Sequence, residues 1–266
     1  MSASGLHVVD GGAGSPIVLL HGLTATHRYV VMGSHALERA GHRVLSYDAR
    51  GHGSSAAGAS ADDYGYPALV GDLVAVLDDA GIERAVLAGA SMGGHTAIAA
   101  ALAQPDRVAG LVVITPAYDP DAFADPASLA RWDRLSSGLR EGGIDGFLRA
   151  YGVPDVPVAW QETLVKVMRQ RLEQHDHPDA VADALAAVPR SRPFTTWADL
   201  ERITVPTVVV ADRDEPDPGH PLAIGEHYAQ LIPGAQLVVE KPGSSPIAWQ
   251  GGQLSRVIEA LAERCA

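Results

Sequence analysis

The stretch Ala85-Val-Leu-Ala-Gly89-Ala-Ser91-Met-Gly93-Gly-His-Thr-Ala97 combines a short apolar run, a turn of small residues and the start of a helix. A serine at the tip of such a strand-to-helix turn is held with its hydroxyl exposed. Gly89 and Gly93 stand where side chains would collide with neighbouring backbone. The helix beginning at Met92 directs free N–H groups toward the same place, which favours a developing negative charge. The stretch therefore predicts a nucleophilic serine on an α/β fold.

Short apolar runs alternate with helical patterns on both sides of this turn, which predicts a mostly parallel sheet flanked by helices. Amphipathic spacing predicts helices around Leu69–Leu77 and Leu254–Leu261, and Gly81 is placed to end the first of them. Leu6–Val9 is a candidate edge strand. The other expected strands are Ile17–Leu20, Val44–Tyr47, Ala85–Ala88, Leu111–Ile114, Thr207–Val210 and Gln236–Val239.

One segment interrupts the alternation. Between about residues 118 and 195 there are helical patterns but no convincing strand, and the strand at Thr207 resumes the series. We expect a helical cap over 118–195, inserted into a core formed by 1–117 and 196–266. Such an insertion would lie over the carboxyl ends of the strands, where open α/β sheets bind ligands.

The composition narrows the class of protein. A net charge of −12 argues against a nucleic-acid partner, which would require a basic face. No apolar run approaches the roughly 20 residues of a membrane span. The first residues do not resemble a secretory signal, and the single cysteine, Cys265, has no partner for an internal disulfide, so we expect a cytoplasmic location. The sequence carries no signal for the oligomeric state.

These motifs resemble the α/β-hydrolase superfamily, in particular its small bacterial esterases, enol-lactonases and carbon–carbon hydrolases. Leu20-His-Gly-Leu23 resembles the oxyanion loop of that family, which implies that the N–H groups of Leu23 and Met92 form the oxyanion hole. Asp48-Ala-Arg-Gly-His-Gly-Ser54 resembles a structural turn of the family. His21 and His52 are accordingly interpreted as residues that organise loops rather than as bases.

The resemblance also implies an acid and a base for the serine, in the chain order Ser, Asp or Glu, His. Asp214, in a loop that follows the strand at Thr207, is the matching acid, and Asp212 is a nearby alternative. The base is expected just after the last strand, but the loop there contains Gly243-Ser244-Ser-Pro246 and position 244 is serine where histidine is expected. Serine has no useful basicity near neutral pH.

Three explanations remain open. Position 244 carries a deliberate His→Ser change, which would leave a crippled catalytic mutant. Alternatively, the natural protein lacks the histidine and is a non-hydrolytic lyase, cyclase or receptor-like binding protein. In the third explanation another histidine supplies the base, and His220, in the loop beyond Asp214, is the candidate.

Several weaker features also suggest roles. Trp132, Trp160 and Trp249 are candidates for contact with a small-molecule substrate. Arginines of the expected cap could attract a substrate carboxylate, although arginines on such helices usually face solvent; they are Arg131, Arg134, Arg169 and Arg171. His175-Asp-His177 is interpreted as a solvated helix end rather than a metal site, and no phosphate-binding loop, metal or other cofactor is indicated.

Taken with the resemblance, the residues predict a serine hydrolase of a small carboxylic ester, lactone or thioester. In the intact mechanism Ser91 attacks the carbonyl, a histidine at position 244 takes its proton, and Asp214 orients that histidine.

Overall fold

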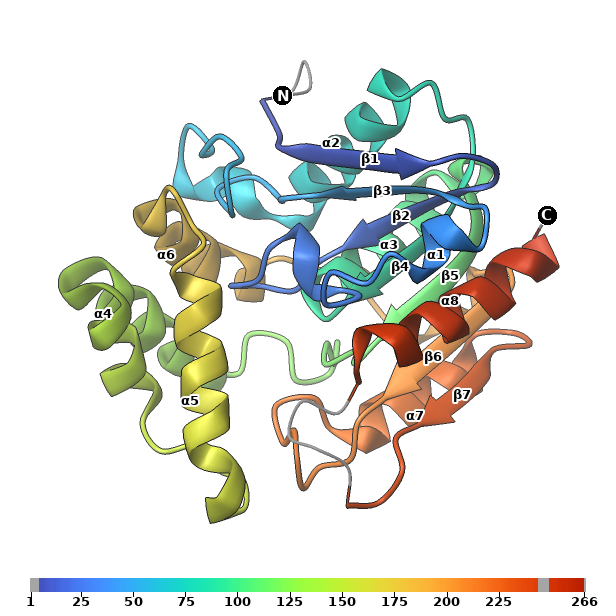
Figure 1. Cartoon of the computed structure of the whole chain (residues 1–266). Coiled ribbons are helices and arrows are strands. Elements are labelled where there is room, and N and C mark those ends of the chain that lie inside the picture. The colour runs from blue at the N-terminus through green and yellow to red at the C-terminus, as the bar shows by residue number, and fades with distance from the viewer. Residues whose placement is uncertain (1–4, 244–248, 266) are drawn as a thin grey trace.

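A seven-stranded sheet runs through the middle of the molecule in the computed structural model, which describes residues 5–243 and 249–265 (Figure 1). The strand order is β1-β3-β2-β4-β5-β6-β7, and only β1 is antiparallel to its neighbour. The strands are β1 (Val8–Gly12), β2 (Pro16–Leu20), β3 (Arg43–Tyr47), β4 (Ala85–Ala90), β5 (Val108–Ile114), β6 (Thr207–Ala211) and β7 (Gln236–Val239). The prediction of a mostly parallel sheet flanked by helices is confirmed.

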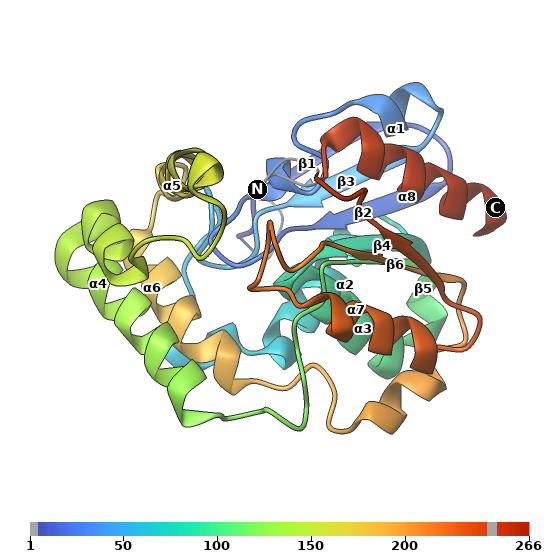
Figure 2. The same cartoon turned by 90° about the horizontal axis from the view of Figure 1, so that it is seen from below.

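Helices cover both faces of the sheet, with α1 and α8 on one side and α2, α3 and α7 on the other (Figure 2). These helices are α1 (Ala36–Arg39), α2 (Tyr66–Asp79), α3 (Met92–Ala103), α7 (Leu222–Leu231) and α8 (Gly251–Cys265). The short 3-10 helices are η1 (His27–Tyr29), η2 (Ala61–Tyr64), η3 (Pro105–Arg107), η4 (Val188–Arg190) and η5 (Trp197–Arg202).

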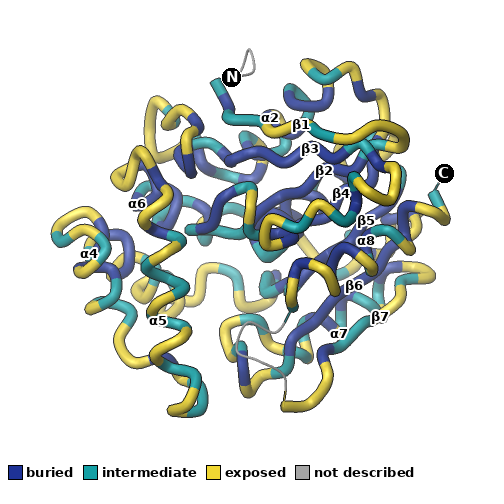
Figure 3. The backbone as a smooth tube through the Cα atoms, viewed as in Figure 1, coloured by how far each residue is buried: buried dark blue, intermediate teal, exposed yellow. Residues whose placement is uncertain are grey.

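Successive side chains of the central strands point to opposite faces of the sheet, and each face has its own hydrophobic core. Leu87 of β4 packs into the cluster under α2 and α3, whereas its neighbours Val86 and Ala88 pack into the cluster under α8. Successive side chains of a strand point to opposite faces, so a strand covered on both sides is apolar at every position. The central strands are accordingly buried along their length (Figure 3).

Residues 115–206, all of which the structure describes, contain no strand. Their main helices stand to one side of the sheet (Figure 1) and are called the cap helices below. They are α4 (Pro126–Tyr151), α5 (Val158–Leu172) and α6 (Pro178–Ala187). The long helix α4 bends at Gly143, whose φ of 58° is not helical. Within the described part of the chain, no helix is both long enough and apolar enough to span a membrane.

Candidate active site

The turn between β4 and α3 holds Ser91 in a strained backbone conformation, with φ 48° and ψ −114°. Its N–H donates to the Ile114 carbonyl of β5, at 2.9 Å. A Cβ on Gly89 would lie 2.3 Å from the Gly93 backbone, and one on Gly93 would lie 2.1 Å from the Leu20 carbonyl oxygen. Only glycine fits at these two positions. The closely packed backbone around the turn therefore holds Ser91 in its strained conformation.

The hydroxyl of Ser91 contacts a histidine. Ser91 Oγ lies 3.0 Å from His220 Nε2, and the other ring nitrogen, Nδ1, lies 2.7 Å from Asp217 Oδ2. An imidazole that donates its Nδ1–H to a carboxylate leaves Nε2 free to accept the serine proton. A serine hydroxyl, an imidazole and a carboxylate therefore lie in hydrogen-bonded series, all within the described residues.

The electrostatics of this series suit a base and its acid. Burial opposes the charged imidazole, but the adjacent Asp217 carboxylate outweighs it and raises the pKa of His220. Burial also opposes the charge on Asp217. The charge of His220, together with the interactions of Asp217 with His220, Asp212 and the Gly219 N–H, nevertheless lowers the pKa of Asp217. The arrangement favours an ionised Asp217 facing an imidazole that can take up a proton.

The loop from Asp212 to Pro221, between β6 and α7, supplies both His220, which contacts Ser91, and Asp217, which contacts His220. From the sequence, His220 was only the third of three explanations for the base, and Asp217 was not expected in the site. The spacing Asp217-Pro-Gly-His220 is the one signal that could have drawn attention to them, because a proline–glycine turn brings residues three apart together.

Asp214, the expected acid, lies elsewhere. It is exposed, and its Oδ1 accepts the N–H of Leu222 at the start of α7, at 2.7 Å. Among the described contacts it has none with His220. Position 244, where the base was expected, lies outside the described residues. Within the described residues, the histidine that contacts Ser91 is His220, from the loop after β6, which agrees with the third of the explanations left open by the sequence.

A cavity of about 950 Å³ opens above Ser91, between the ends of the strands and the cap helices. Leu23 and Met92, the expected oxyanion residues, both line it beside Ser91. Trp132 and Trp249 also line it, whereas Trp160 is not among the described lining residues.

Two cap arginines, Arg131 of α4 and Arg171 of α5, line this cavity. Arg171, near the end of α5, lies with its guanidinium 5.0 Å from the centre of the Tyr29 ring. Burial lowers its pKa, and its charge acts on both Asp217 and His220. Its Nε is buried without a hydrogen-bond partner, and no ion pair to Arg171 occurs within residues 5–243 and 249–265. The cavity therefore contains a cation to which the described residues offer no ion pair, and its charge acts on His220.

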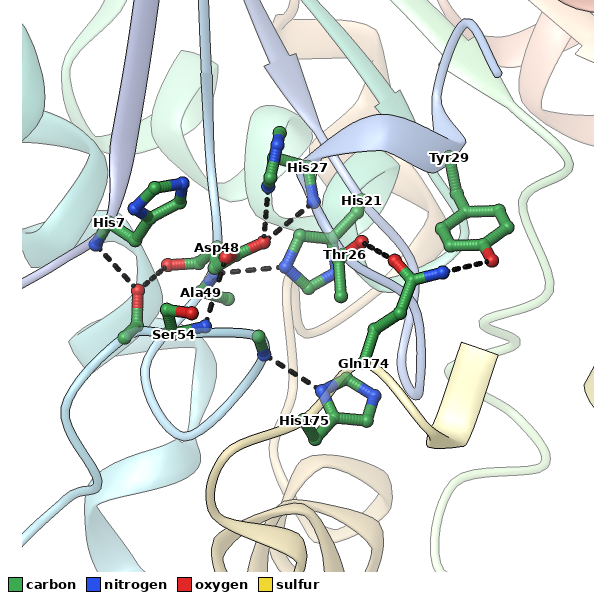
Figure 4. A network of polar contacts seen from close by, with 12 residues as sticks. His7, His21, Thr26, His27, Tyr29, Asp48, Ala49, Ser54, Gln174 and His175 are labelled. Carbon is green, nitrogen blue, oxygen red and sulfur yellow. Dashed lines mark hydrogen bonds and ion pairs between the residues drawn. The ribbon is translucent and has the colours of Figure 1, made fainter. Parts of the chain in front are cut away.

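A second group of histidines surrounds Asp48 at the junction of the core with the cap (Figure 4). His21 donates from Nδ1 to the Gly22 carbonyl (2.8 Å) and accepts the Ala49 N–H at Nε2 (2.8 Å). His52 donates to the Arg50 carbonyl, at 3.0 Å. Both rings are buried; burial lowers the pKa of His21 to about 4 and holds the pKa of His52 well below its usual range. The interpretation of these two histidines as loop organisers agrees with these contacts.

His175 belongs to the same group, contrary to the expectation of a solvated helix end. It follows α5, is only 9% exposed, accepts the Gly53 N–H at Nδ1 (2.8 Å) and donates from Nε2 to the Thr24 carbonyl (3.0 Å). Nearby, Gln174 joins Tyr29 and Thr26 (Figure 4). These contacts attach the end of α5 to the loops that follow β2 and β3. His177 is exposed, as expected.

His7, His27 and Asp48 are the residues best placed to hold a metal ion in the described part of the chain, since their ligand atoms lie within 4.8 Å of one another. The Asp48 carboxylate already accepts the backbone and ring N–H groups of His27 and the Ser54 N–H. These bonds lower the pKa of Asp48 to about 2 against the effect of burial. Protein donors thus satisfy this carboxylate.

A serine on a strained strand-to-helix turn, with an imidazole on its hydroxyl, defines a hydrolase-type site on a parallel sheet. Residues 15–194 match the model of the alpha/beta hydrolase fold family, and the chain belongs to this family. It is a hydrolase of the α/β class, like its relatives.

Individual relatives agree with this assignment. A 2-hydroxy-6-oxononadienedioate/2-hydroxy-6-oxononatrienedioate hydrolase of Cupriavidus pinatubonensis is 32% identical, over 87% of this chain and 81% of its own. A thermophilic esterase from Thermogutta terrifontis, solved with malate bound, is 27% identical with a TM-score of 0.75, covering 97% of this chain and 92% of its own. The enol-lactonase from Burkholderia xenovorans LB400 is 23% identical with a TM-score of 0.69, covering 97% and 94%, and shows the shared fold.

Proposed function

We propose that this chain is an active serine hydrolase in which Ser91 is the nucleophile, His220 the base and Asp217 the orienting acid. The single observation that carries the proposal is the 3.0 Å contact between Ser91 Oγ and His220 Nε2. Serine is a weak nucleophile unless an adjacent base accepts its proton. With His220 in that place, hydrolysis requires no histidine at position 244.

The mechanism follows from these contacts. Ser91 Oγ attacks the substrate carbonyl carbon while its proton passes to His220 Nε2, and Asp217 stabilises the resulting imidazolium. The N–H groups of Leu23 and Met92 hold the oxyanion. The imidazolium then gives its proton to the leaving group, which departs and leaves an acyl-enzyme. A water molecule, deprotonated by His220, attacks the acyl carbon and regenerates Ser91.

The substrate we propose is a small carboxylic ester, lactone or thioester that also carries a carboxylate. The support for the carboxylate is Arg171, an unpaired cation that lines the cavity near Ser91. A guanidinium binds a carboxylate through two parallel hydrogen bonds, and a partly buried cation gains more from such a pair than an exposed one. Of the two relatives described above, one is an esterase and the other hydrolyses a dioate, a substrate with two carboxylates.

We propose that the segment 118–195 acts as the cap that closes the substrate chamber against the core of 1–117 and 196–266. Its support is the cavity lining, which combines cap residues such as Trp132 and Arg171 with Ser91. Cytoplasmic location and the absence of nucleic-acid and membrane partners remain part of the proposal. The alternative, a non-hydrolytic protein on the same fold, rested on a missing base, and the contact between His220 and Ser91 removes that ground.

A direct test uses the chain as it is, with Ser244 unchanged. We expect hydrolysis of p-nitrophenyl butyrate and covalent labelling by a fluorophosphonate probe, with the label at Ser91 by peptide mass spectrometry. Ser91→Ala removes both, because no other group here is presented as a nucleophile.

The control is Ser54→Ala, which removes an exposed hydroxyl in the turn after β3 and leaves both readouts unchanged. Tight binding of carboxylate-bearing esters without turnover or labelling would favour the non-hydrolytic alternative and reject the proposal.

A further inference from the structure

A second carboxyl group lies behind the His220–Asp217 pair. Asp212 follows β6 directly and lines the same cavity as Asp217, and the charges of the two groups act on each other. An ionised carboxylate has only acceptor oxygens, so two ionised carboxylates cannot form a hydrogen bond with each other. A hydrogen bond between them requires that one of the two groups carries a proton.

The surroundings decide which group carries it. Asp217 receives N–H donors from His220 and Gly219, which favour its ionised form. Asp212 is only 7% exposed, and its Oδ1 is buried without a donor among the residues that the structure describes. An ionised oxygen left without a donor in a buried place is costly, whereas a neutral carboxyl group tolerates it far better.

We propose that Asp212 is a positioning residue, which carries a proton in the resting protein and donates it in a hydrogen bond to Asp217. The proposal deepens the proposed function and rests on it, since it concerns the acid behind the base of the same site. Asp212 stands at the end of a buried strand, whereas Asp217 lies in an irregular loop between two prolines. The hydrogen bond thereby ties the acid of the loop to the sheet and keeps a single negative charge behind His220.

The titration of the site agrees with this assignment. Burial, followed by the charges of Asp217 and Glu240, raises the pKa of Asp212 to about 7, while the pKa of Asp217 is lowered. The other charged or titratable groups that face this pair are His220 in the same loop, Glu240 after β7 with Arg213 bonded to it, Arg171 from α5 and His95 from α3.

Loss of this proton has two consequences above about pH 7. The hydrogen bond to Asp217 becomes a repulsion between like charges, and a second negative charge raises the pKa of His220 further. Hydrolysis needs neutral His220, so activity first rises with pH as the imidazole loses its proton. It then declines as Asp212 ionises. The two pKa values read from such a profile describe the coupled set of His220, Asp212 and Asp217 rather than any single residue.

The experiment compares Asp212→Asn with Asp212→Ala in kcat/KM for p-nitrophenyl butyrate, from about pH 5 to about pH 9. Asparagine can donate an N–H to Asp217 but cannot ionise. We expect D212N to equal the unchanged chain within about threefold near pH 6 and to exceed it about tenfold near pH 9, where the alkaline decline disappears. D212A lacks the donor, and we expect it to lose about tenfold or more across the range.

The matched control is Glu215→Gln, which removes one negative charge from an exposed position in the same loop and keeps the shape of the profile. Two results overturn the proposal: an alkaline decline that persists in D212N, or a D212N variant as damaged as D212A at every pH. The second result would mean that Asp212 acts in its ionised form. Circular dichroism confirms that each variant is folded.

A second readout does not depend on activity. In a ¹³C NMR titration of labelled aspartate carboxyl groups, the Asp212 resonance is assigned by its loss in D212N, and it should titrate near pH 7. An Asp212 resonance that titrates below about pH 4 overturns the proposal even in a chain that hydrolyses nothing. Conversely, absence of Ser91-dependent hydrolysis with an Asp212 that titrates near pH 7 rejects the proposed function alone.

Discussion

The ring of His220 and the rings of four buried histidines are bonded in different ways. His220 contacts a hydroxyl on one nitrogen and a carboxylate on the other. His21, His52, His95 and His175 bond mainly to backbone carbonyl and N–H groups. A ring whose partners are backbone groups is fixed in one neutral tautomer, whereas a ring backed by a carboxylate can accept a proton.

The pKa values separate the two groups in the same way. Burial lowers the pKa of His21 to about 4 and that of His95 to about 3, where burial acts together with the charge of His220. His220 is also surrounded by protein, yet Asp217 raises its pKa. Among these rings, burial without a carboxylate partner lowers the pKa, whereas the carboxylate beside His220 raises it. Each prediction below tests this distinction, beginning with the largest effect.

Removal of the base has the largest expected effect. His220→Ala should lower kcat for p-nitrophenyl butyrate about 10⁴-fold or more, because the serine then lacks a proton acceptor. The matched control is His177→Ala, which removes an exposed histidine at the start of α6 and should leave kcat unchanged.

Ser244→His offers a test of the competing explanation. We expect no gain in hydrolysis when histidine is added at 244 in the presence of His220. A large gain, together with an inactive unchanged chain, would support a lost base at 244 and contradict the role of His220.

The second prediction concerns stability as a function of pH. The folded-state pKa of His21 lies at about 4, below the 6.5 of the unfolded chain, so its contribution is complete above about pH 6.5 and is lost as pH falls toward 4. The loss is on the order of 3 kcal/mol of unfolding free energy. His220, with its raised pKa, has the opposite sign: its contribution is present below pH 6.5 and is lost as pH rises through the folded-state value.

Urea unfolding from about pH 4 to about pH 8 measures these contributions. His21→Gln should flatten the acid side of the stability curve, whereas His220→Gln should leave the acid side steep. A similar flattening in both variants would mean that the two rings are not distinguished by their partners.

The third prediction concerns the cation near the base. Arg171→Gln should raise KM about tenfold for an ester that carries a carboxylate and leave KM for a neutral ester of the same size nearly unchanged. The variant should also raise the pKa of His220, because the charge of Arg171 lowers it. Arg169→Gln is the control, since Arg169 pairs with Asp145 outside the cavity lining. Equal changes in KM for both esters would contradict a carboxylate-binding role.

Much of this fold was predictable because its signals are local. The apolar runs predicted all seven strands, and the small residues around Ser91 predicted its turn, since each depends on neighbours within a few positions. The partners of Ser91 depend on the path of the loop from Asp212 to Pro221, which crosses back over the end of β4. No periodicity encodes that path, so family resemblance directed attention to Asp214 and Ser244. The burial of His175 was missed for the same reason, because its partners Gly53 and Thr24 lie far away in sequence.

The smallest expected effect belongs to Asp214, the acid that resemblance suggested. Its carboxylate accepts the Leu222 N–H at 2.7 Å, which satisfies a free donor at the start of α7. Asp214→Asn retains an acceptor and should cost at most about 1 kcal/mol of stability, with kcat changed less than about twofold. Asp217→Asn should instead lower kcat about 10³-fold or more, because the imidazole loses its orienting carboxylate. The reverse pattern, with Asp214 essential and Asp217 dispensable, would restore the acid expected from the sequence and would require His220 to be oriented by another group.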